Sequence, residues 1–253
     1  MLAGERHDQI VSQVNDKGSV LVKDLSSEFG VTEDSIRKDL TMLEKKGLLK
    51  KAYGGAVKIR NNPHERYVAQ RMGKNLECKM IIAKKAMELI REGDIIFLDI
   101  STSNIELARL IIEADITVTV VTNMIDIMLL FSSENKARLI FVGGSFSEGK
   151  DGFVGSLSNQ EVRQYRFDTA FMGVVGVDLE RDVVLTYSPD DASTKSTILE
   201  SSSRTYMMLE HRKLSADGNY IYGSISGFTG AILDEIPGGV ESAQMSRFDI
   251  DWI

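Results

Sequence analysis

From about residue 77 onward, short continuous runs of apolar residues alternate with longer stretches of helical period. Residues 95–98, 139–142 and 206–209 are such runs, and each is too short for a buried helix. Strands that are apolar throughout are buried on both faces, and helices between them are typical of a parallel sheet. The pattern predicts an α/β domain on a mostly parallel sheet, whose ligands bind beyond the carboxyl ends of the strands.

Small or polar residues follow four of the predicted strands. The first of these segments, residues 99–104, opens a predicted helix, and hydroxyls with free N–H groups at a helix N-terminus favour phosphate. The same residue types also serve as ordinary caps and turns, so both interpretations stay open at this point. The candidate residues are Asp99, Ser101, Thr102, Ser103, Asn104, Thr122, Asn123, Gly143, Gly144 and Asp178.

The first 60 residues follow a different plan. Apolar residues at helical spacing predict helices over residues 5–17, 23–29 and 32–46, with glycines at positions 18 and 30 as stops. Thr32 is the expected N-cap of the third helix, whose buried face carries Ile36, Leu40 and Leu43. Residues 47–59 predict a hairpin that turns at Gly54 and Gly55. The order predicts a winged helix-turn-helix.

The charge of the chain is divided unevenly. The whole sequence has a net charge of −7, yet residues 36–60 contain eight basic and two acidic side chains. A local basic stripe on an acidic protein attracts phosphates, although a solvated polar helix face would look similar. The candidate DNA-binding residues on the third helix and the hairpin are Thr32, Ser35, Arg37, Lys38, Thr41, Lys50, Lys51 and Tyr53.

These patterns divide the chain into residues 1–60, a linker at 61–76 and a larger domain at 77–253. The single cysteine excludes an internal disulfide, and the three histidines show no metal-ligand spacing, so neither a metal nor a cofactor is expected. No apolar run reaches the ~18 residues that a membrane span needs. The N-terminus is charged from its fifth residue, which predicts a cytoplasmic protein without a signal peptide.

Several motifs resemble those of the DeoR family of bacterial transcriptional regulators. They are R-x3-I-x3-V from Arg6, T-E-D-S-I-R-K-D-L at 32–40 and K-A-Y-G-G-A-V at 51–57. Further along, V-T-N at 121–123, V-G-G at 142–144 and G-V-V-G-V-D at 173–178 resemble the effector domain of that family. The resemblance implies a fold similar to ribose-5-phosphate isomerase and a phosphorylated sugar or a related metabolite as ligand. It also adds Asp191, Lys195 and Lys213 to the candidate ligand-binding residues.

Three positions depart from the pattern of the family. Ser35 stands where threonine is usual, and it keeps the hydroxyl. The phosphate loop reads S-T-S-N instead of G-T-T, so Ser101 replaces a glycine, and Glu210 replaces an aspartate. The loss of a glycine could change how closely the backbone approaches a ligand.

The resemblance implies a DNA-binding regulator, most simply a repressor of carbohydrate metabolism genes that is relieved by a phosphorylated sugar. Helix-turn-helix proteins read repeated half-sites, so we expect a homodimer or homotetramer without membrane contact. The alternative is an active sugar-phosphate isomerase with an appended DNA-binding domain, since Asp99, Asp178 and Asp191 could supply a base. A third alternative is an architectural DNA-binding protein with an inert second domain, which the acidic second domain disfavours.

Overall fold

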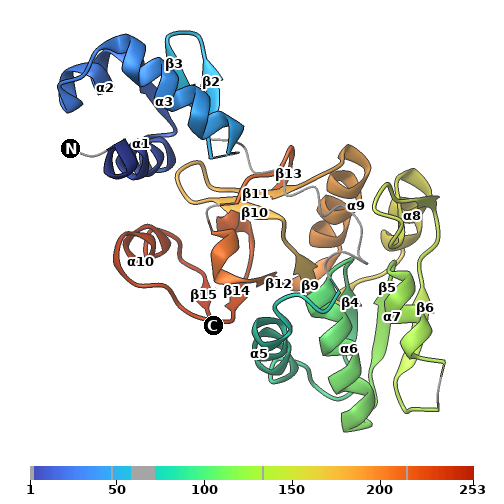
Figure 1. Ribbon diagram of the computed structural model, residues 1–253. Helices are drawn as coiled ribbons and strands as arrows, with labels where there is room; N and C mark the ends of the chain where they lie inside the picture. Colours follow the sequence, from blue (N-terminus) through green and yellow to red (C-terminus); the bar gives the residue numbers. More distant parts are fainter. Residues whose placement is uncertain (1–2, 47, 58–71, 133, 215) are drawn as a thin grey trace. The chain divides into compact units, whose positions relative to one another are not determined.

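The computed structural model describes residues 3–46, 48–57, 72–132, 134–214 and 216–253 (Figure 1). The chain divides into two compact units, Met1–Asn61 and Asn62–Ile253. Most of the predicted linker at residues 61–76 lies outside the described residues. The first unit contains α1 (Ala3–Lys17), β1 (Ser19–Leu21), α2 (Val22–Phe29), α3 (Glu33–Lys45), β2 (Lys50–Ala52) and β3 (Gly55–Val57).

The helix-ending glycine and the N-cap residue predicted from the sequence lie at the ends of α2 and α3. Gly30 ends α2 in the left-handed conformation at φ 64°, and the Thr32 side chain caps α3 by accepting a hydrogen bond from the Ser35 N–H. The antiparallel sheet has the order β1-β3-β2. A Cβ on Gly55 would lie 1.9 Å from the Val20 carbonyl oxygen, so only glycine lets β3 approach β1 this closely. The predicted helix-turn-helix and hairpin are confirmed.

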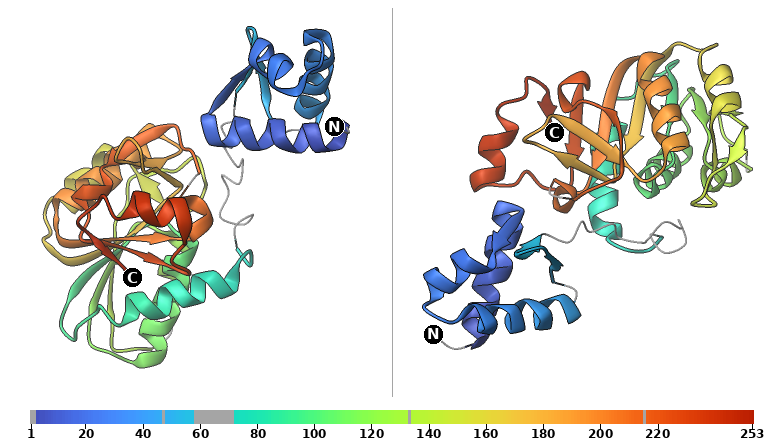
Figure 2. Two further views of the ribbon diagram at one scale, coloured as in Figure 1. Left: turned by 90° about the vertical axis from the view of Figure 1, so that its left-hand side faces the viewer. Right: turned by 90° about the horizontal axis from the view of Figure 1, so that it is seen from above.

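One side of each helix in the first unit packs into a common core. The predicted buried positions Ile36, Leu40 and Leu43 are confirmed, and in both views of Figure 2 the small sheet lies against the helices. Together these residues remove the apolar face of α3 from water and leave its opposite face exposed. The core consists of Ile10, Val14, Val20, Val22, Leu25, Ile36, Leu40, Leu43, Leu49 and Ala56.

A buried carboxylate fastens α1 to α3. Asp39 accepts hydrogen bonds from Arg6 Nε at 2.7 Å and from His7 Nε2 at 2.9 Å. Burial raises the pKa of Asp39, but the hydrogen bonds from Arg6 and His7 outweigh it and hold the pKa below its usual value. The charged form of Asp39 therefore stabilises the folded first unit.

The second unit is built on a seven-stranded sheet of order β15-β14-β12-β9-β4-β5-β6, in which every pair of neighbours is parallel. The chain enters β4, continues outward to β5 and β6, and then crosses back to β9 on the other side of β4. The strands are β4 (Ile95–Leu98), β5 (Thr119–Thr122), β6 (Arg138–Phe141), β9 (Phe167–Gly173), β12 (Ser202–Leu209), β14 (Gly230–Leu233) and β15 (Asp251–Trp252).

Helices cover both faces of this sheet. One core contains side chains of α5 (Leu76–Met87), α6 (Thr102–Ala114) and α7 (Ile125–Leu130). The other contains side chains of α8 (Ser156–Val162), α9 (Pro189–Glu200) and α10 (Gly239–Met245). Strands buried between two helical layers explain why the sequence shows continuous apolar runs. The predicted mostly parallel α/β domain is confirmed.

Two antiparallel additions to the second unit were not predicted from the sequence. One is a sheet of order β10-β11-β13, made by β10 (Gly176–Asp178), β11 (Val183–Thr186) and β13 (Tyr220–Gly223). The other is a hairpin of β7 (Ser145–Phe146) and β8 (Phe153–Val154). Their strands have two to four residues, too few to establish a period-2 pattern. Both additions lie after strands that end at the same edge of the large sheet.

Replacing Asp39 with asparagine should destabilise the first unit by about 1–3 kcal/mol, because Arg6 and His7 lose a charged partner. Since the folded pKa of Asp39 is depressed, its stabilisation is present near neutral pH and disappears as the pH falls below about 4. Hydrogen exchange of the full chain, read by mass spectrometry over residues 3–57, measures the opening free energy. The matched control is Asp8→Asn on the exposed face of α1, and an equal effect of both variants would contradict the assignment.

Candidate functional site

All eight candidate DNA-binding residues belong to one part of the first unit. Thr32 and Ser35 lie at the start of α3, and their hydroxyl oxygens are 3.0 Å apart. The hairpin joins α3 directly, because Lys51 Nζ donates to Thr41 Oγ1 at 2.8 Å. The recognition surface, as we call it, consists of Thr32, Ser35, Arg37, Lys38, Thr41, Lys50, Lys51 and Tyr53, of which Ser35 and Thr41 are half-buried and the others exposed.

Two cations near the start of α3 are paired within the helix. Arg37 Nη2 lies 2.8 Å from Glu33, and Lys38 Nζ lies 2.9 Å from Asp34, both at a spacing of four residues. Exposed ion pairs of this kind are weak, so a phosphate or a base edge can replace the carboxylate at little cost. The pairs hold the long side chains close to the helix without removing them from the solvent.

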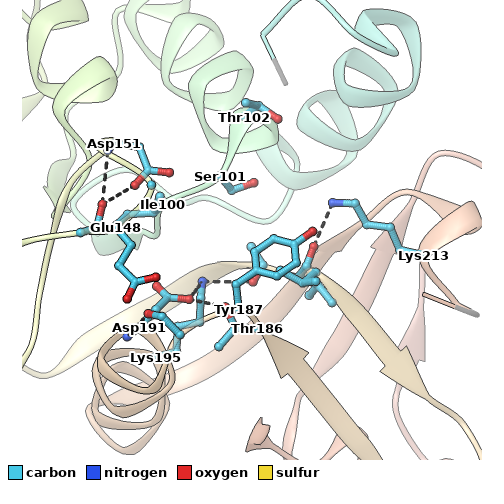
Figure 3. Close-up of a pocket in the computed structure, with 16 residues that line it drawn as sticks. Ile100, Ser101, Thr102, Glu148, Asp151, Thr186, Tyr187, Asp191, Lys195 and Lys213 are labelled. Atoms are coloured by element: carbon cyan, nitrogen blue, oxygen red, sulfur yellow. Dashed lines mark hydrogen bonds and ion pairs between the residues drawn. The ribbon is translucent and has the colours of Figure 1, made fainter. Parts of the chain in front are cut away.

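The second unit has a pocket beyond the carboxyl ends of β4 and β9 (Figure 3). From β4 the chain continues toward β5 on one side, while β9 lies on the other, so the pocket is at the point where the strand order reverses. Crevices at such points are the usual ligand sites of open α/β sheets. Ser101 and Thr102 line the pocket at the N-terminus of α6, where the helix dipole favours an anion.

A buried ion pair supports the floor of the pocket. Lys195 on α9 donates hydrogen bonds to Asp99, directly after β4, and to the Gly173 carbonyl oxygen on β9 at 3.1 Å. The same carboxylate accepts the Gly173 N–H at 2.8 Å. Asp191 lies one turn before Lys195 at 3.9 Å and accepts a hydrogen bond from the Thr186 hydroxyl. Three elements of the fold therefore converge on one carboxylate.

The environment of this pair shifts two pKa values. Burial is the largest influence on Asp99 and raises its pKa, Lys195 opposes the rise, and Asp191 adds to it, with a result of about 6. Burial and the same two carboxylates raise the pKa of Tyr222 well above its usual value, so its phenol stays neutral and donates to the Gly173 carbonyl oxygen at 3.1 Å. Negative charge is thus already crowded beneath the pocket.

Only some of the candidate ligand-binding residues line the pocket. Those that do are Ser101, Thr102, Asp191, Lys195 and Lys213. Ser101 has an extended backbone at φ −159°, which any residue adopts, and its hydroxyl caps α6. The glycine that the family usually has here is therefore dispensable. Glycine is required instead at position 173, which faces Ser101, because a Cβ there would lie 2.7 Å from the Ser101 Cβ.

The remaining candidates have structural contacts elsewhere. Asp99 lies beneath the pocket with Lys195, and Ser103 is buried in the first turn of α6. Asn104 donates to the carbonyl oxygens of Asp99 and Phe171, and Thr122 donates to that of Leu98. Asn123 donates a hydrogen bond to the Phe153 carbonyl oxygen. The Gly143 carbonyl oxygen accepts a hydrogen bond from the Ser158 hydroxyl, and Gly144 packs against the same side chain. Asp178 accepts hydrogen bonds from the N–H groups of Glu180 and Arg181.

Part of the lining comes from segments that the sequence did not single out. The loop between β7 and β8 supplies Glu148 and Asp151, and the segment between β11 and α9 supplies Tyr187. Neither segment has a period, and a cluster of polar residues such as 147–151 is also what an ordinary surface turn contains. The lining residues missed are Ile100, Ser147, Glu148, Gly149, Asp151, Val174, Val175, Thr186, Tyr187 and Ser188.

The carboxylate of Glu210 connects the pocket to the residue that precedes α5. Glu210 follows β12 and accepts hydrogen bonds from Asn75 Nδ2 at 2.6 Å and from Arg212 Nε at 2.9 Å. Lys213 lies 3.8 Å from the other oxygen of Glu210 and donates to the Val174 carbonyl oxygen in the pocket wall. Asn75 is the residue before α5, so one carboxylate contacts both the segment that enters this unit and a lining residue.

Two kinds of feature are absent from the described part of the chain. No helix there is long and apolar enough to cross a membrane. No group of three or more histidine, cysteine, aspartate or glutamate side chains is arranged there to hold a metal ion.

Comparison with known proteins agrees with both units. Residues 6–62 match the model of the DeoR-like helix-turn-helix domain, and residues 74–235 match that of the DeoR C terminal sensor domain. The chain is 31% identical over 219 residues to the lactose phosphotransferase system repressor of Staphylococcus epidermidis, covering 84% of each protein. It is 31% identical over 215 residues to the HTH-type transcriptional regulator GlpR of Haloferax volcanii, covering 85% of this chain and 83% of that protein.

Among solved structures, ribose 5-phosphate isomerase A from Methanocaldococcus jannaschii aligns with 55% of each chain at 17% identity and a TM-score of 0.40. The two family models account for most of the chain, and they lie on the two units that the contacts define. The chain therefore belongs to the DeoR family of transcriptional regulators, which bind DNA through the helix-turn-helix and are not enzymes.

Proposed function

We propose that this regulator is a repressor of genes for carbohydrate metabolism, and that a phosphorylated sugar in the pocket of the second unit changes its affinity for operator DNA. The observation that carries the proposal is the pocket itself. It combines the N-terminus of α6, with Ser101 and Thr102, and the Lys213 ammonium group at the switch point of a parallel sheet. These are groups that hold a phosphate, and the side chains opposite them can accept hydrogen bonds from sugar hydroxyls.

The names of relatives support this reading. The proteins from Staphylococcus epidermidis and Agrobacterium fabrum are named a lactose phosphotransferase system repressor and a transcriptional repressor, at 31% and 28% identity. Both alignments cover more than four fifths of this chain. We extend the role of a repressor, and a carbohydrate-derived signal, to this chain on that basis.

The pocket offers little to an isomerase. Aldose–ketose isomerisation needs a carboxylate that reaches a substrate C–H bond. Asp99 is fully buried and bonded to Lys195, and Asp178 accepts N–H groups in a turn outside the lining. Of these three candidate bases only Asp191 lines the pocket, and it is already hydrogen bonded to Thr186, while the other lining carboxylates, Glu148 and Asp151, come from the loop between β7 and β8. Incubation with ribose 5-phosphate and hexose 6-phosphates, followed by NMR, would reveal turnover if the enzyme alternative were correct.

A ligand in the second unit can change DNA affinity only by binding one of two conformational states more tightly than the other. Such coupling is typically about 1–3 kcal/mol. By reciprocity, operator DNA must change ligand affinity by the same factor. This requirement gives the proposal a thermodynamic test that is independent of which domain movement occurs.

The recognition surface generates a prediction about sequence reading. Arg37→Ala should weaken binding to the preferred DNA sequence by about 1–3 kcal/mol and relax the preference at one base position. Lys51→Ala should weaken binding to all sequences alike and reduce the salt slope by about one. Binding to duplexes selected from random sequence measures both, with Lys136→Ala in the second unit as control. A wild-type protein without sequence preference at moderate salt would contradict the proposed function.

Assembly gives a second prediction. One helix-turn-helix makes too small a contact for high specificity, so we expect a homodimer or homotetramer held largely by residues 77–253. Sedimentation at micromolar concentration, with and without selected DNA, measures the state. A strictly monomeric profile under both conditions would overturn this part of the proposal.

Thr102→Val tests the phosphate end of the pocket. The change preserves size and removes one hydroxyl, so it should weaken the effector response about tenfold and leave DNA affinity without effector unchanged. A DNA-binding titration of wild type and variant with candidate sugar phosphates makes the comparison, with the exposed Thr117→Val as control. An unaltered response of Thr102→Val to an effector of the wild type would show that the phosphate lies elsewhere.

A further inference from the structure

Two carboxylates hold the start of α5 at the ends of neighbouring strands. Glu210, after β12, accepts a hydrogen bond from Asn75 Nδ2 at 2.6 Å, and we call this contact the Glu210 anchor. Asp234, after β14, is hydrogen bonded to the thiol of Cys78, accepts the His211 N–H at 2.7 Å and lies 2.9 Å from His211 Nδ1. These contacts form the Asp234 anchor. Since β12 and β14 are parallel neighbours, both anchors lie at the edge of the sheet that carries the pocket.

The Glu210 anchor also contacts the pocket. The ammonium nitrogen of Lys213, a lining residue, lies 3.8 Å from the Glu210 carboxylate and donates to the Val174 carbonyl oxygen at 2.9 Å. Figure 3 shows the Lys213 side chain reaching toward the pocket. The described lining of the pocket includes no residue of the Asp234 anchor. The two anchors therefore hold the same helix, but only the Glu210 anchor has a lining residue as a neighbour.

The charge of Glu210 depends on groups from both sides. Its side chain is 3% exposed, and burial raises its pKa, but Arg212, Lys213 and Asn75 together hold the pKa below its usual value. A buried carboxylate that loses a cation becomes costly to keep away from water. Lys213 and Asn75 thus stabilise one charge, the former from the pocket and the latter from the start of α5.

We propose that a phosphate in the pocket competes with Glu210 for Lys213, so that effector binding releases Asn75 and loosens the start of α5. This inference rests on the proposed function, which brings a phosphate to Lys213. A phosphate dianion attracts the ammonium group more strongly than a single carboxylate does. Glu210 then gains by turning toward water, and it gives up Asn75. Asn75 and Glu210 are positioning residues that connect the pocket to the segment through which the chain enters the second unit.

Linkage makes the proposal testable from the end that is remote from the ligand. If ligand binding weakens the contact of Asn75 with Glu210, then removal of that contact must strengthen ligand binding. Asn75→Gly removes the amide and keeps the left-handed backbone at φ 50°, which glycine adopts readily. We expect this variant of the full chain to bind inorganic phosphate about fivefold more tightly than the wild type does, by calorimetry at constant ionic strength.

Two further variants separate this coupling from a general loosening of α5. Cys78→Ala removes the thiol of the Asp234 anchor and should leave phosphate affinity unchanged. Glu210→Gln removes the charge that competes for Lys213, so it should tighten phosphate binding, and Asn75→Gly should add nothing in that background. Equal tightening by Asn75→Gly and Cys78→Ala would overturn the proposal, as would a full effect of Asn75→Gly combined with Glu210→Gln.

Hydrogen exchange of the full chain tests the same connection without a ligand. Lys213→Met should speed amide exchange over residues 75–83 about threefold or more, because Glu210 loses its cation on the pocket side. Lys136→Met is the matched control, since it removes an exposed lysine that is paired with Asp115. An exchange rate that is unchanged in Lys213→Met would contradict the proposal.

The outcomes separate this inference from the proposed function. If the wild type binds phosphate and Asn75→Gly binds it equally well, the connection is wrong and the sugar-phosphate sensor stands. If the wild type binds no phosphate at millimolar concentrations, the contact of a phosphate with Lys213 is wrong, and this inference fails together with that part of the proposed function.

Discussion

The buried pair of Asp99 and Lys195 is the interaction on which the second unit depends. It joins the end of β4, the helix α9 and, through Gly173, the end of β9, which are three of the elements around the pocket. Desolvating two charges is costly, and the loss of one partner would leave the other buried and uncompensated. A substitution of Asp99 or Lys195 alone should therefore be strongly destabilising. Gly173 is equally constrained, since any side chain there would strike Ser101. The residues at the floor of the pocket are therefore tightly constrained.

Ion pairs in the two units illustrate how burial decides what a charge contributes. Arg37 and Lys38 are paired with acids on an exposed helix, where such pairs are weak and leave both cations available for the proposed contact with DNA. Asp39, on the inner side of the same helix, holds α1 in place through Arg6 and His7. Adjacent residues of one turn thus divide between the proposed DNA contact and the stability of the first unit. Helical geometry alone assigns the roles, because residues 38 and 39 point about 100° apart.

The sequence predicts the first unit better than the pocket, and the reason is the range of the interactions involved. Gly30 and Thr32 act within one turn of the chain, so their residue types indicate the structure directly. The pocket combines segments far apart in sequence, and its loop with Glu148 carries no periodic signal. Sequence reasoning also selects residues that do not line the pocket, because their contacts too depend on distant segments of the chain. Thr122 and Asn123 follow a strand as ligand-binding residues do, yet their side chains satisfy backbone carbonyls.

Glu210 has a consequence for how sequences of this family vary. Its carboxylate reaches Asn75 across 135 positions of sequence, and Asn75 adopts the left-handed conformation that asparagine tolerates better than most residues. An aspartate at 210, one methylene shorter, would not span the same gap to an asparagine. The two positions should therefore covary, with glutamate at 210 accompanying a short amide at 75. Where that pairing is broken, the segment that leads into α5 must be anchored by a different contact.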